Sequence, residues 1–176
     1  MAAYRRFVQT FYDLTKAADP TRPVNDASGY VHWKTDLWTV HSYRATPKEQ
    51  KEFLLPKKGD RPVASNIPGA EPPYEGQPFL LDEWGGFKYL LPADRKSGTG
   101  WGYNGLCFTK EKDFLDRIAA QTRLFASMKE LAGWCYTQLT DVEQEQNGVY
   151  TYDRRAKVAP KKLAALFGAR PSWSAW

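Results

Sequence analysis

Three short apolar runs alternate along the chain with segments of helical periodicity, and this alternation most constrains the fold. Each run has the length of a β-strand and ends in polar residues: DLWTVHSY (36–43), PFLLDE (78–83) and LAGWCYTQL (131–139). Successive strands that are separated by helices pair in parallel within one sheet. The chain is therefore expected to form an α/β protein with a parallel sheet.

Helix signals fill the stretches before and between these runs. Four helices are predicted from apolar spacing and from terminal proline and glycine residues, over 3–18, 47–55, 111–129 and 160–168. Two stretches without periodicity, 56–77 and 90–105, are expected to be long loops. A brief additional strand is predicted at 23–25, which would give four strand units in all.

Size and charge exclude several classes of protein. A chain of 176 residues suits one domain. The net charge of +5 comes from scattered basic pairs rather than from a stripe, which argues against a nucleic-acid partner. Two cysteines, Cys107 and Cys135, are too few for a disulfide scaffold. No apolar run has the length of a membrane span, and the N-terminus lacks a signal peptide, so the chain is expected to be soluble, and cytoplasmic if Met1 is the true start.

Aromatic residues form 15% of the chain, more than a core of this size needs. Two explanations stay open: aromatic faces that stack on ligands such as sugars, and interfaces of a larger assembly. In parallel α/β folds the ligand lies at the carboxyl ends of the strands. The polar residues that end the three apolar runs are therefore expected to meet at one mouth.

Several of these segments together resemble a known family. The stretches PFLLDEWGG, GTGWGYNG and LAGWCYTQLTDVEQEQNGVYTYDRR, with DPTRPVNDASG and DLWTVHSY upstream, resemble the C-terminal half of the catalytic (β/α)8 TIM barrel of glycoside hydrolase family 2, which includes β-galactosidases and β-glucuronidases. The resemblance covers roughly residues 5–165, and WCYTQLTDVEQEQNG is its most specific part. It implies strands five to eight of the barrel in a partial domain over 1–168, followed by a tail at 169–176.

The resemblance also implies an activity. The family hydrolyses β-glycosidic bonds with retention, using two carboxylic acids and no cofactor, and its nucleophile falls on Glu83. Its general acid/base is a Glu that follows an Asn, and the chain has no Asn-Glu pair. We therefore expect a β-galactosidase-like fragment that supplies the nucleophile for a β-linked sugar, and that pairs with the missing half-barrel or with itself. The alternative is a non-catalytic carbohydrate-binding or interaction module.

The residues around Glu83 are expected to have different roles, some in the site and some in the structure of the strand. Gly85 and Gly86 would let the chain turn sharply beside the carboxylate, whereas Asp82 should point to the opposite face of the strand and be structural. By resemblance, Tyr43 hydrogen-bonds the nucleophile, although it also reads as an ordinary half-buried sheet tyrosine. His41, on the same face, either lines the sugar site or is a core histidine.

Further aromatic residues are candidates for sugar binding. By resemblance, Tyr136 forms a platform under the sugar, while Trp134 belongs to the core. Trp84 and Trp101 lie in loops of the expected mouth and would either stack on substrate or pack the loops down.

Two motifs suggest a dinucleotide site and a calcium site, but the residues around them do not fit either site. GWGYNG (100–105) fits the dinucleotide fingerprint G-x-G-x-x-G, but a polar loop precedes it where a strand is required. Asp141, Glu143 and Glu145 form an acidic cluster that lacks the glycine and distal Glu of a calcium loop. The cluster indicates a solvated or substrate-facing loop, and no metal or cofactor is expected.

Overall fold

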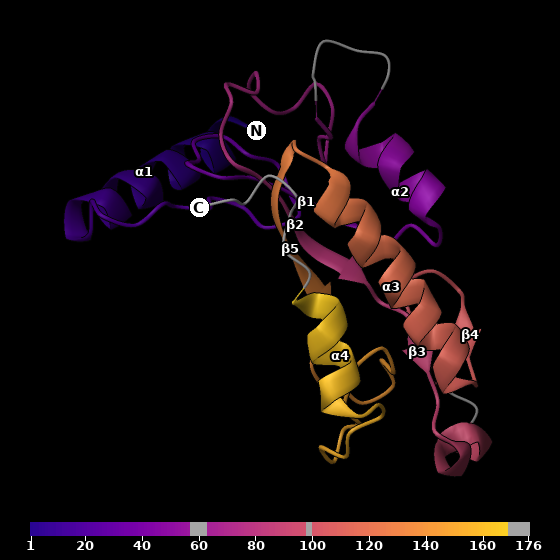
Figure 1. Cartoon of the computed structure of the whole chain (residues 1–176). Helices are drawn as coiled ribbons and strands as arrows, with labels where there is room; N and C mark the ends of the chain where they lie inside the picture. Colours follow the sequence, from indigo (N-terminus) through magenta and orange to yellow (C-terminus); the bar gives the residue numbers. More distant parts are fainter. Residues whose placement is uncertain (57–62, 98–99, 169–176) are drawn as a thin grey trace.

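A three-stranded parallel sheet forms the centre of the molecule (Figure 1). The structure, a computed structural model, describes residues 1–56, 63–97 and 100–168. The sheet has the order β1-β2-β5, and its strands are Trp38–Ser42, Phe79–Gly85 and Leu131–Thr137. All its pairings are parallel. The predicted α/β architecture with a parallel sheet is confirmed.

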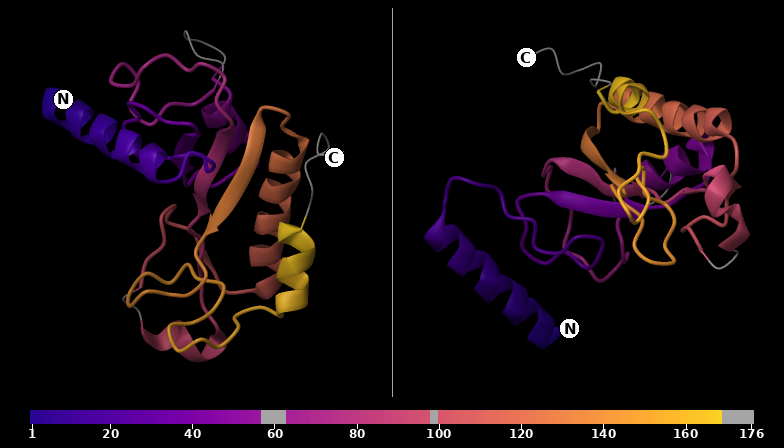
Figure 2. Two further views of the ribbon diagram at one scale, coloured as in Figure 1. Left: turned by 90° about the vertical axis from the view of Figure 1, so that its left-hand side faces the viewer. Right: turned by 90° about the horizontal axis from the view of Figure 1, so that it is seen from below.

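The four predicted helices are all present. They are α1 (Ala2–Ala18), α2 (Pro47–Leu54), α3 (Glu111–Ser127) and α4 (Pro160–Phe167). α3 lies against β5 and contacts both α2 and α4. α1 lies apart from the sheet, on the side away from α3 and α4 (Figure 2).

Local sequence signals explain where these helices begin and end. Thr46 caps α2 through a capping box, in which its side chain accepts from the Glu49 backbone N–H and the Glu49 carboxylate accepts from the Thr46 backbone N–H. α4 begins with Pro160, where a missing N–H costs no hydrogen bond, and ends at Gly168. In α3, Phe114, Ile118 and Phe125 share the buried face.

The core fills the space between the sheet and the helices that cover it. Its largest fully buried apolar side chains come from the strands, from α2 and α3, and from the turn between β2 and β3: Trp38, Trp84, Phe79, Phe87, Phe114, Phe125, Leu54, Leu81, Ile118 and Leu131. The central strand β2 is apolar because both of its neighbours and the helix layer exclude water from it. The packing therefore fixes the ends of β1, β2 and β5 relative to one another.

Residues 23–25 are not a strand, contrary to prediction. Val24 instead exchanges hydrogen bonds with Asp36: the backbone N–H of Asp36 donates to the Val24 carbonyl at 2.9 Å, and the Asp36 carboxylate accepts from the Val24 N–H at 2.9 Å. The Asp36 carboxylate thus accepts the backbone N–H that would otherwise pair with a neighbouring strand. The main sheet of the described residues has three strands, so the structure shows a parallel α/β fold and does not confirm the expected half-barrel of four strands.

Part of the predicted loop 90–105 has regular structure. A 3-10 helix occupies Pro92–Ser97. On either side of the predicted loop, β3 (Lys88–Tyr89) and β4 (Cys107–Phe108) pair in parallel as a second, two-stranded sheet. Hydrophobic periodicity does not reveal strands of two residues. The predicted tail at 169–176 lies outside the described residues.

Three polar side chains attach α1 to the following segment. Tyr4 donates to the Val31 carbonyl at 2.6 Å, while Asp36 accepts from the Tyr12 hydroxyl at 2.5 Å and pairs with Lys16 at 3.1 Å. Within the parts of the chain that are described, no helix is both long enough and apolar enough to cross a membrane.

Candidate active site

The carboxyl ends of the three parallel strands meet at one edge of the sheet. The backbone N–H of Gly86, just after β2, donates to the Thr137 carbonyl at the end of β5, at 2.9 Å. Tyr43, just after β1, reaches across to Glu83 near the end of β2. The polar strand ends therefore converge, because parallel strands present their carboxyl ends on the same side.

Glu83 is held at this edge by one of its two carboxylate oxygens. The Tyr43 hydroxyl donates to Oε2, and Nδ1 of His41 lies 3.1 Å from the same oxygen. Among the described residues no hydrogen bond reaches Oε1, and 36% of the Glu83 side chain is exposed. The carboxylate is thus fixed through Oε2 and presents Oε1 to an incoming group.

A β-bulge in β2 brings both acidic residues to the same histidine. Val40 and His41 of β1 pair with Leu81 and Glu83, so Asp82 is an extra residue in β2. The expected alternation of faces is interrupted there. Nε2 of His41 lies 3.6 Å from Asp82, which also accepts from the Ser28 hydroxyl at 2.7 Å. Asp82 consequently contacts the Glu83 site instead of pointing away from it.

Two glycines allow aromatic rings to approach the strand end. Gly85 and Gly86 both have positive φ values, +95° and +60°, which disfavour any side chain. A Cβ atom on Gly85 would lie 2.3 Å from the Tyr136 ring, and one on Gly86 would lie 2.8 Å from the rings of Tyr43 and Tyr103. The rings thus occupy the space that side chains would otherwise fill.

Tyr103 and Trp101 form an exposed aromatic wall beside Tyr43. The rings of Tyr43 and Tyr103 are stacked, with centroids 3.9 Å apart and planes at 9°, and Trp101 meets Tyr103 edge-on at 5.3 Å. Trp101 is 47% exposed and Tyr103 is 46% exposed. Tyr103 was not among the predicted site residues; its only signal in the sequence is its position between Gly102 and Asn104 in GWGYNG.

Trp84 and Tyr136 lie away from the open side of the site. Trp84 is fully buried and packs edge-on against Phe125 and Tyr136, so it has no surface to offer a ligand. Strand β2 continues through Trp84 and turns its ring into the core. Tyr136 covers Gly85, and its hydroxyl donates to the Asn147 carbonyl at 3.3 Å.

The tyrosines of the site are held in their neutral form. Burial raises the pKa of Tyr43, and the hydrogen bond to Glu83 raises it further. The pKa of Tyr103 is raised by burial and by the charges of Glu145 and Glu83. Burial likewise raises the pKa of Tyr136. Tyr43 therefore remains a hydrogen-bond donor to Glu83 well into the alkaline range.

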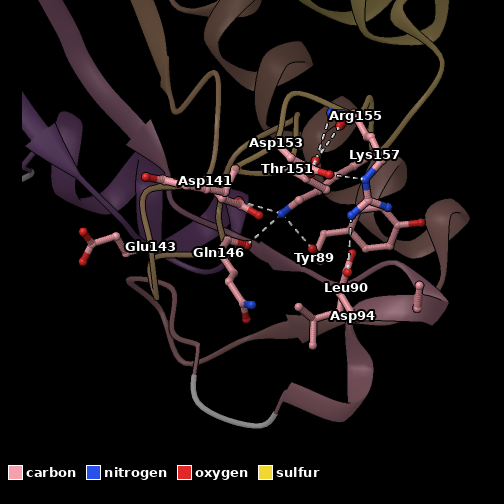
Figure 3. A pocket seen from close by; sticks show the side chains of 12 residues that line it. Tyr89, Leu90, Asp94, Asp141, Glu143, Gln146, Thr151, Asp153, Arg155 and Lys157 are labelled. Carbon is pink, nitrogen blue, oxygen red and sulfur yellow. Dashed lines mark hydrogen bonds and ion pairs between the residues drawn. The ribbon is translucent and has the colours of Figure 1, made fainter.

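A cavity of about 230 Å³ lies under the loop that follows β5 (Figure 3). At its wall the buried Lys157 donates to Asp141 at 2.7 Å and to the carbonyls of Tyr89 and Gln146 at 2.9 and 3.2 Å. Asp141 is buried, whereas the acidic cluster was expected to lie in a solvated or substrate-facing loop. Over residues 1–56, 63–97 and 100–168, no three His, Cys, Asp or Glu side chains are grouped to hold a metal ion.

The Tyr43–Glu83 hydrogen bond should contribute measurably to stability. We expect Tyr43→Phe to lower the free energy of unfolding by about 1.5–3 kcal/mol, because a hydrogen bond to a charged group is lost in a half-buried site. Since the folded-state pKa of Tyr43 is raised, this contribution is complete below about pH 10 and is lost as the pH rises above it. Urea denaturation measures the change. Tyr152→Phe, at an exposed tyrosine, is the control and should stay within about 0.5 kcal/mol of the parent; equal losses in the two variants would contradict the bond.

Comparison with solved structures identifies similar folds. A GH2 β-galacturonidase from Eisenbergiella tayi bound to glycerol has a TM-score of 0.56 and 16% identity, over 93% of this chain and 30% of that chain. The same enzyme bound to galacturonate gives 0.56 and 16% over 95% and 31%. A β-D-glucuronidase of Dictyoglomus thermophilum gives 0.57 and 16% over 96% and 29%. No protein-family model and no curated protein matches the sequence.

These matches confirm, at the level of the fold, the resemblance to glycoside hydrolase family 2 that the sequence showed. Nearly the whole chain superposes on part of each neighbour. The chain spans about 30% of the length of these proteins.

Proposed function

We propose that this chain carries the nucleophile-bearing part of a retaining glycosidase that acts on β-linked sugars, with Glu83 as the nucleophile. One observation carries the proposal: at the carboxyl edge of a parallel sheet, Oε2 of Glu83 accepts from Tyr43 and lies 3.1 Å from His41, while Oε1 has no hydrogen-bond partner among the described residues. The similarity of the fold to GH2 glycosidases supports the same assignment.

In this mechanism Oε1 of Glu83 attacks the anomeric carbon as the bond to the leaving oxygen breaks. The leaving oxygen takes a proton from a general acid, and the sugar remains bound to Glu83 as an ester. Water then attacks the anomeric carbon, gives its proton to the same group acting as base, and releases Glu83 as a carboxylate. Tyr43 and His41 orient Glu83 by occupying Oε2, which leaves a single oxygen for attack.

The proton donor is assigned to a part of the enzyme beyond this sequence. Retaining enzymes place the two carboxyl groups about 5–5.5 Å apart. Asp82, the acidic neighbour in β2, is already engaged by Ser28 and lies against the His41 ring. The chain spans about 30% of its structural neighbours, so the proposal includes a partner segment that brings the acid.

The aromatic wall supports a sugar as the substrate. Trp101 and Tyr103 expose ring faces and edges next to the Tyr43–Glu83 pair. The C–H-rich face of a pyranose packs on such rings, while its hydroxyl groups bond to the polar side chains. Two of the neighbours are named for galacturonides and glucuronides, so we propose β-linked hexosides and hexuronides as the class to be tested.

Covalent trapping tests the nucleophile directly. Incubation with 2-fluoro β-glycosides of galactose and glucuronic acid, each with an activated aryl leaving group, should add one sugar to the chain. An activated leaving group departs without protonation, so the test does not depend on the missing general acid. Peptide mass spectrometry should place the sugar on Glu83. Absence of the adduct, under conditions that label a GH2 glycosidase run in parallel, or an adduct at another residue, contradicts the proposal.

The exposed aromatic wall favours a second candidate, a carbohydrate-binding module without catalysis. Calorimetric titration with the free sugars separates the two. Binding that Trp101→Ala abolishes, in a chain that fluorinated glycosides do not label, would support the binding module.

A further inference from the structure

The segment that follows β5 brings an acidic side chain to the aromatic wall. Glu145 and Trp101 are paired by a parallel bridge. The backbone N–H of Trp101 donates to the Gln144 carbonyl at 2.8 Å, and that of Gln146 donates to the Trp101 carbonyl at 2.9 Å. Residues that are paired in this way project their side chains to the same side. The Glu145 carboxylate and the exposed Trp101 indole therefore lie on the same side of the bridge.

Hydrogen bonds fix the position of this carboxylate. Oε1 of Glu145 accepts from the side-chain amide of Asn147 at 3.0 Å, and the oxygen of that amide accepts from Nε2 of Gln138 at 2.7 Å. Asn147 is fully buried, whereas Glu145 is partly exposed. The backbone of Glu145 also exchanges two hydrogen bonds with Val142, at 2.9 and 3.0 Å. The carboxylate is thus held in place before a ligand arrives, which lowers the entropic cost of binding.

A row of aromatic rings connects Glu145 to the candidate nucleophile. Trp101 meets Tyr103 edge-on, and Tyr103 stacks on Tyr43. The Tyr43 hydroxyl in turn donates to Glu83. Beyond the effect of burial, the charges of Glu145 and Glu83 both raise the pKa of Tyr103. The two carboxylates therefore lie at the two ends of one aromatic surface.

In the described parts of the chain, no lysine or arginine lies within ion-pair distance of either carboxylate. Lys88, in β3, donates to the Gly100 carbonyl and so helps to hold the loop of the aromatic wall. A sugar carboxylate on this surface would meet two like charges without a cation to balance them. The hydroxyl groups of a neutral sugar can instead donate to either carboxylate.

We propose that Glu145 is a specificity-determining residue, which accepts hydrogen bonds from the hydroxyl groups of a neutral sugar seated on Trp101 and excludes hexuronides. Hydrogen bonds to a charged acceptor are stronger than those to a neutral one, while the indole packs on the C–H face of the sugar ring. The inference rests on the proposed function for the place of the sugar. It narrows the substrate class to hexosides and separates this chain from the neighbours named for galacturonides and glucuronides.

A matched pair of sugars tests the proposal on the free chain. Methyl β-galactopyranoside carries a hydroxymethyl group where methyl β-galactopyranosiduronate carries a carboxylate, and the two are otherwise identical. Calorimetric titration at about pH 7.5 gives both dissociation constants. We expect the neutral sugar to bind about tenfold more tightly or better, because of the charge repulsion. Glu145→Gln should weaken binding of the galactoside and strengthen binding of the uronide, whereas a general disturbance of the fold would weaken both.

A control substitution and a salt series accompany this variant. Glu143→Gln makes the same change in the same loop, on a side chain that lines the cavity of Figure 3, and should leave the ratio of the two constants unchanged. About 1 M NaCl should bring the two constants of the parent closer together, since salt screens the repulsion. The salt series needs no substitution, so it decides the question if Glu145→Gln does not fold.

Tighter or equal binding of the uronide by the parent chain overturns the proposal. Binding of neither sugar also overturns it, as does a ratio that folded Glu145→Gln leaves unchanged. Covalent labelling of Glu83 without the preference for the neutral sugar would refute this inference alone. The preference without labelling would refute the nucleophile alone.

Discussion

Replacing Glu83 with Gln is expected to lower kcat/KM for β-glycoside hydrolysis by about 10⁴-fold or more, because loss of the nucleophile in a covalent mechanism removes most of the catalysis. The amide has the size of the carboxylate and can still accept from Tyr43 through its oxygen. It cannot carry the negative charge that attacks the anomeric carbon. Initial rates with an aryl β-glycoside measure the effect in an active preparation that contains this chain.

Two companion substitutions separate charge from position. Glu83→Asp keeps the charge but withdraws it by one methylene, and a displacement of this size costs about 10²-fold in rate. Glu52→Gln makes the same chemical change on the exposed side of α2 and should leave the rate unchanged. A Glu83→Gln enzyme that keeps its rate within tenfold of the parent would remove Glu83 from the nucleophile role.

The sequence predicted the elements that periodicity specifies. α1 and α3 carry long apolar stripes, and the ends of α2 and α4 are marked by Thr46, Pro160 and Gly168. Strands β1 and β2 are apolar because the helix layer covers the sheet, whereas β5, at the edge of the sheet, leaves Ala132 and Cys135 exposed. The strand expected at 23–25 did not form, since a side chain outside that segment supplies its hydrogen bonds.

The sequence predicted the site residues that lie at strand ends, but not those whose positions depend on a bulge or on the tertiary fold. Glu83 and Tyr43 each end an apolar run and were assigned to the site by the family resemblance, and the structure brings them together. Asp82 was placed on the wrong face because a bulge adds one residue to β2, and no periodicity marks it. Tyr103 is distant in sequence from Tyr43, and only the tertiary fold stacks the two rings.

The buried pair of Lys157 and Asp141 should dominate the stability of the loop that follows β5. We expect Lys157→Met to lower the free energy of unfolding by about 3–5 kcal/mol, because it leaves a buried carboxylate without its partner. Burial already raises the pKa of Asp141 and lowers that of Lys157, although each partner's charge offsets part of the effect. Urea denaturation with an unchanged slope would assign the loss to stability alone.

A matched substitution and a double variant identify the cause of this loss. Lys162→Met makes the same change in the exposed pair with Glu111 and should cost less than about 1 kcal/mol. Adding Asp141→Asn to Lys157→Met removes the stranded charge and should restore part of the stability, since the penalty belongs to the unpaired carboxylate rather than to the missing lysine. Lys157 also bonds to the carbonyls of Tyr89 and Gln146 (Figure 3), so the recovery should remain incomplete. Equal losses for Lys157→Met and Lys162→Met would show that Asp141 finds another partner, and that the loop does not depend on this pair.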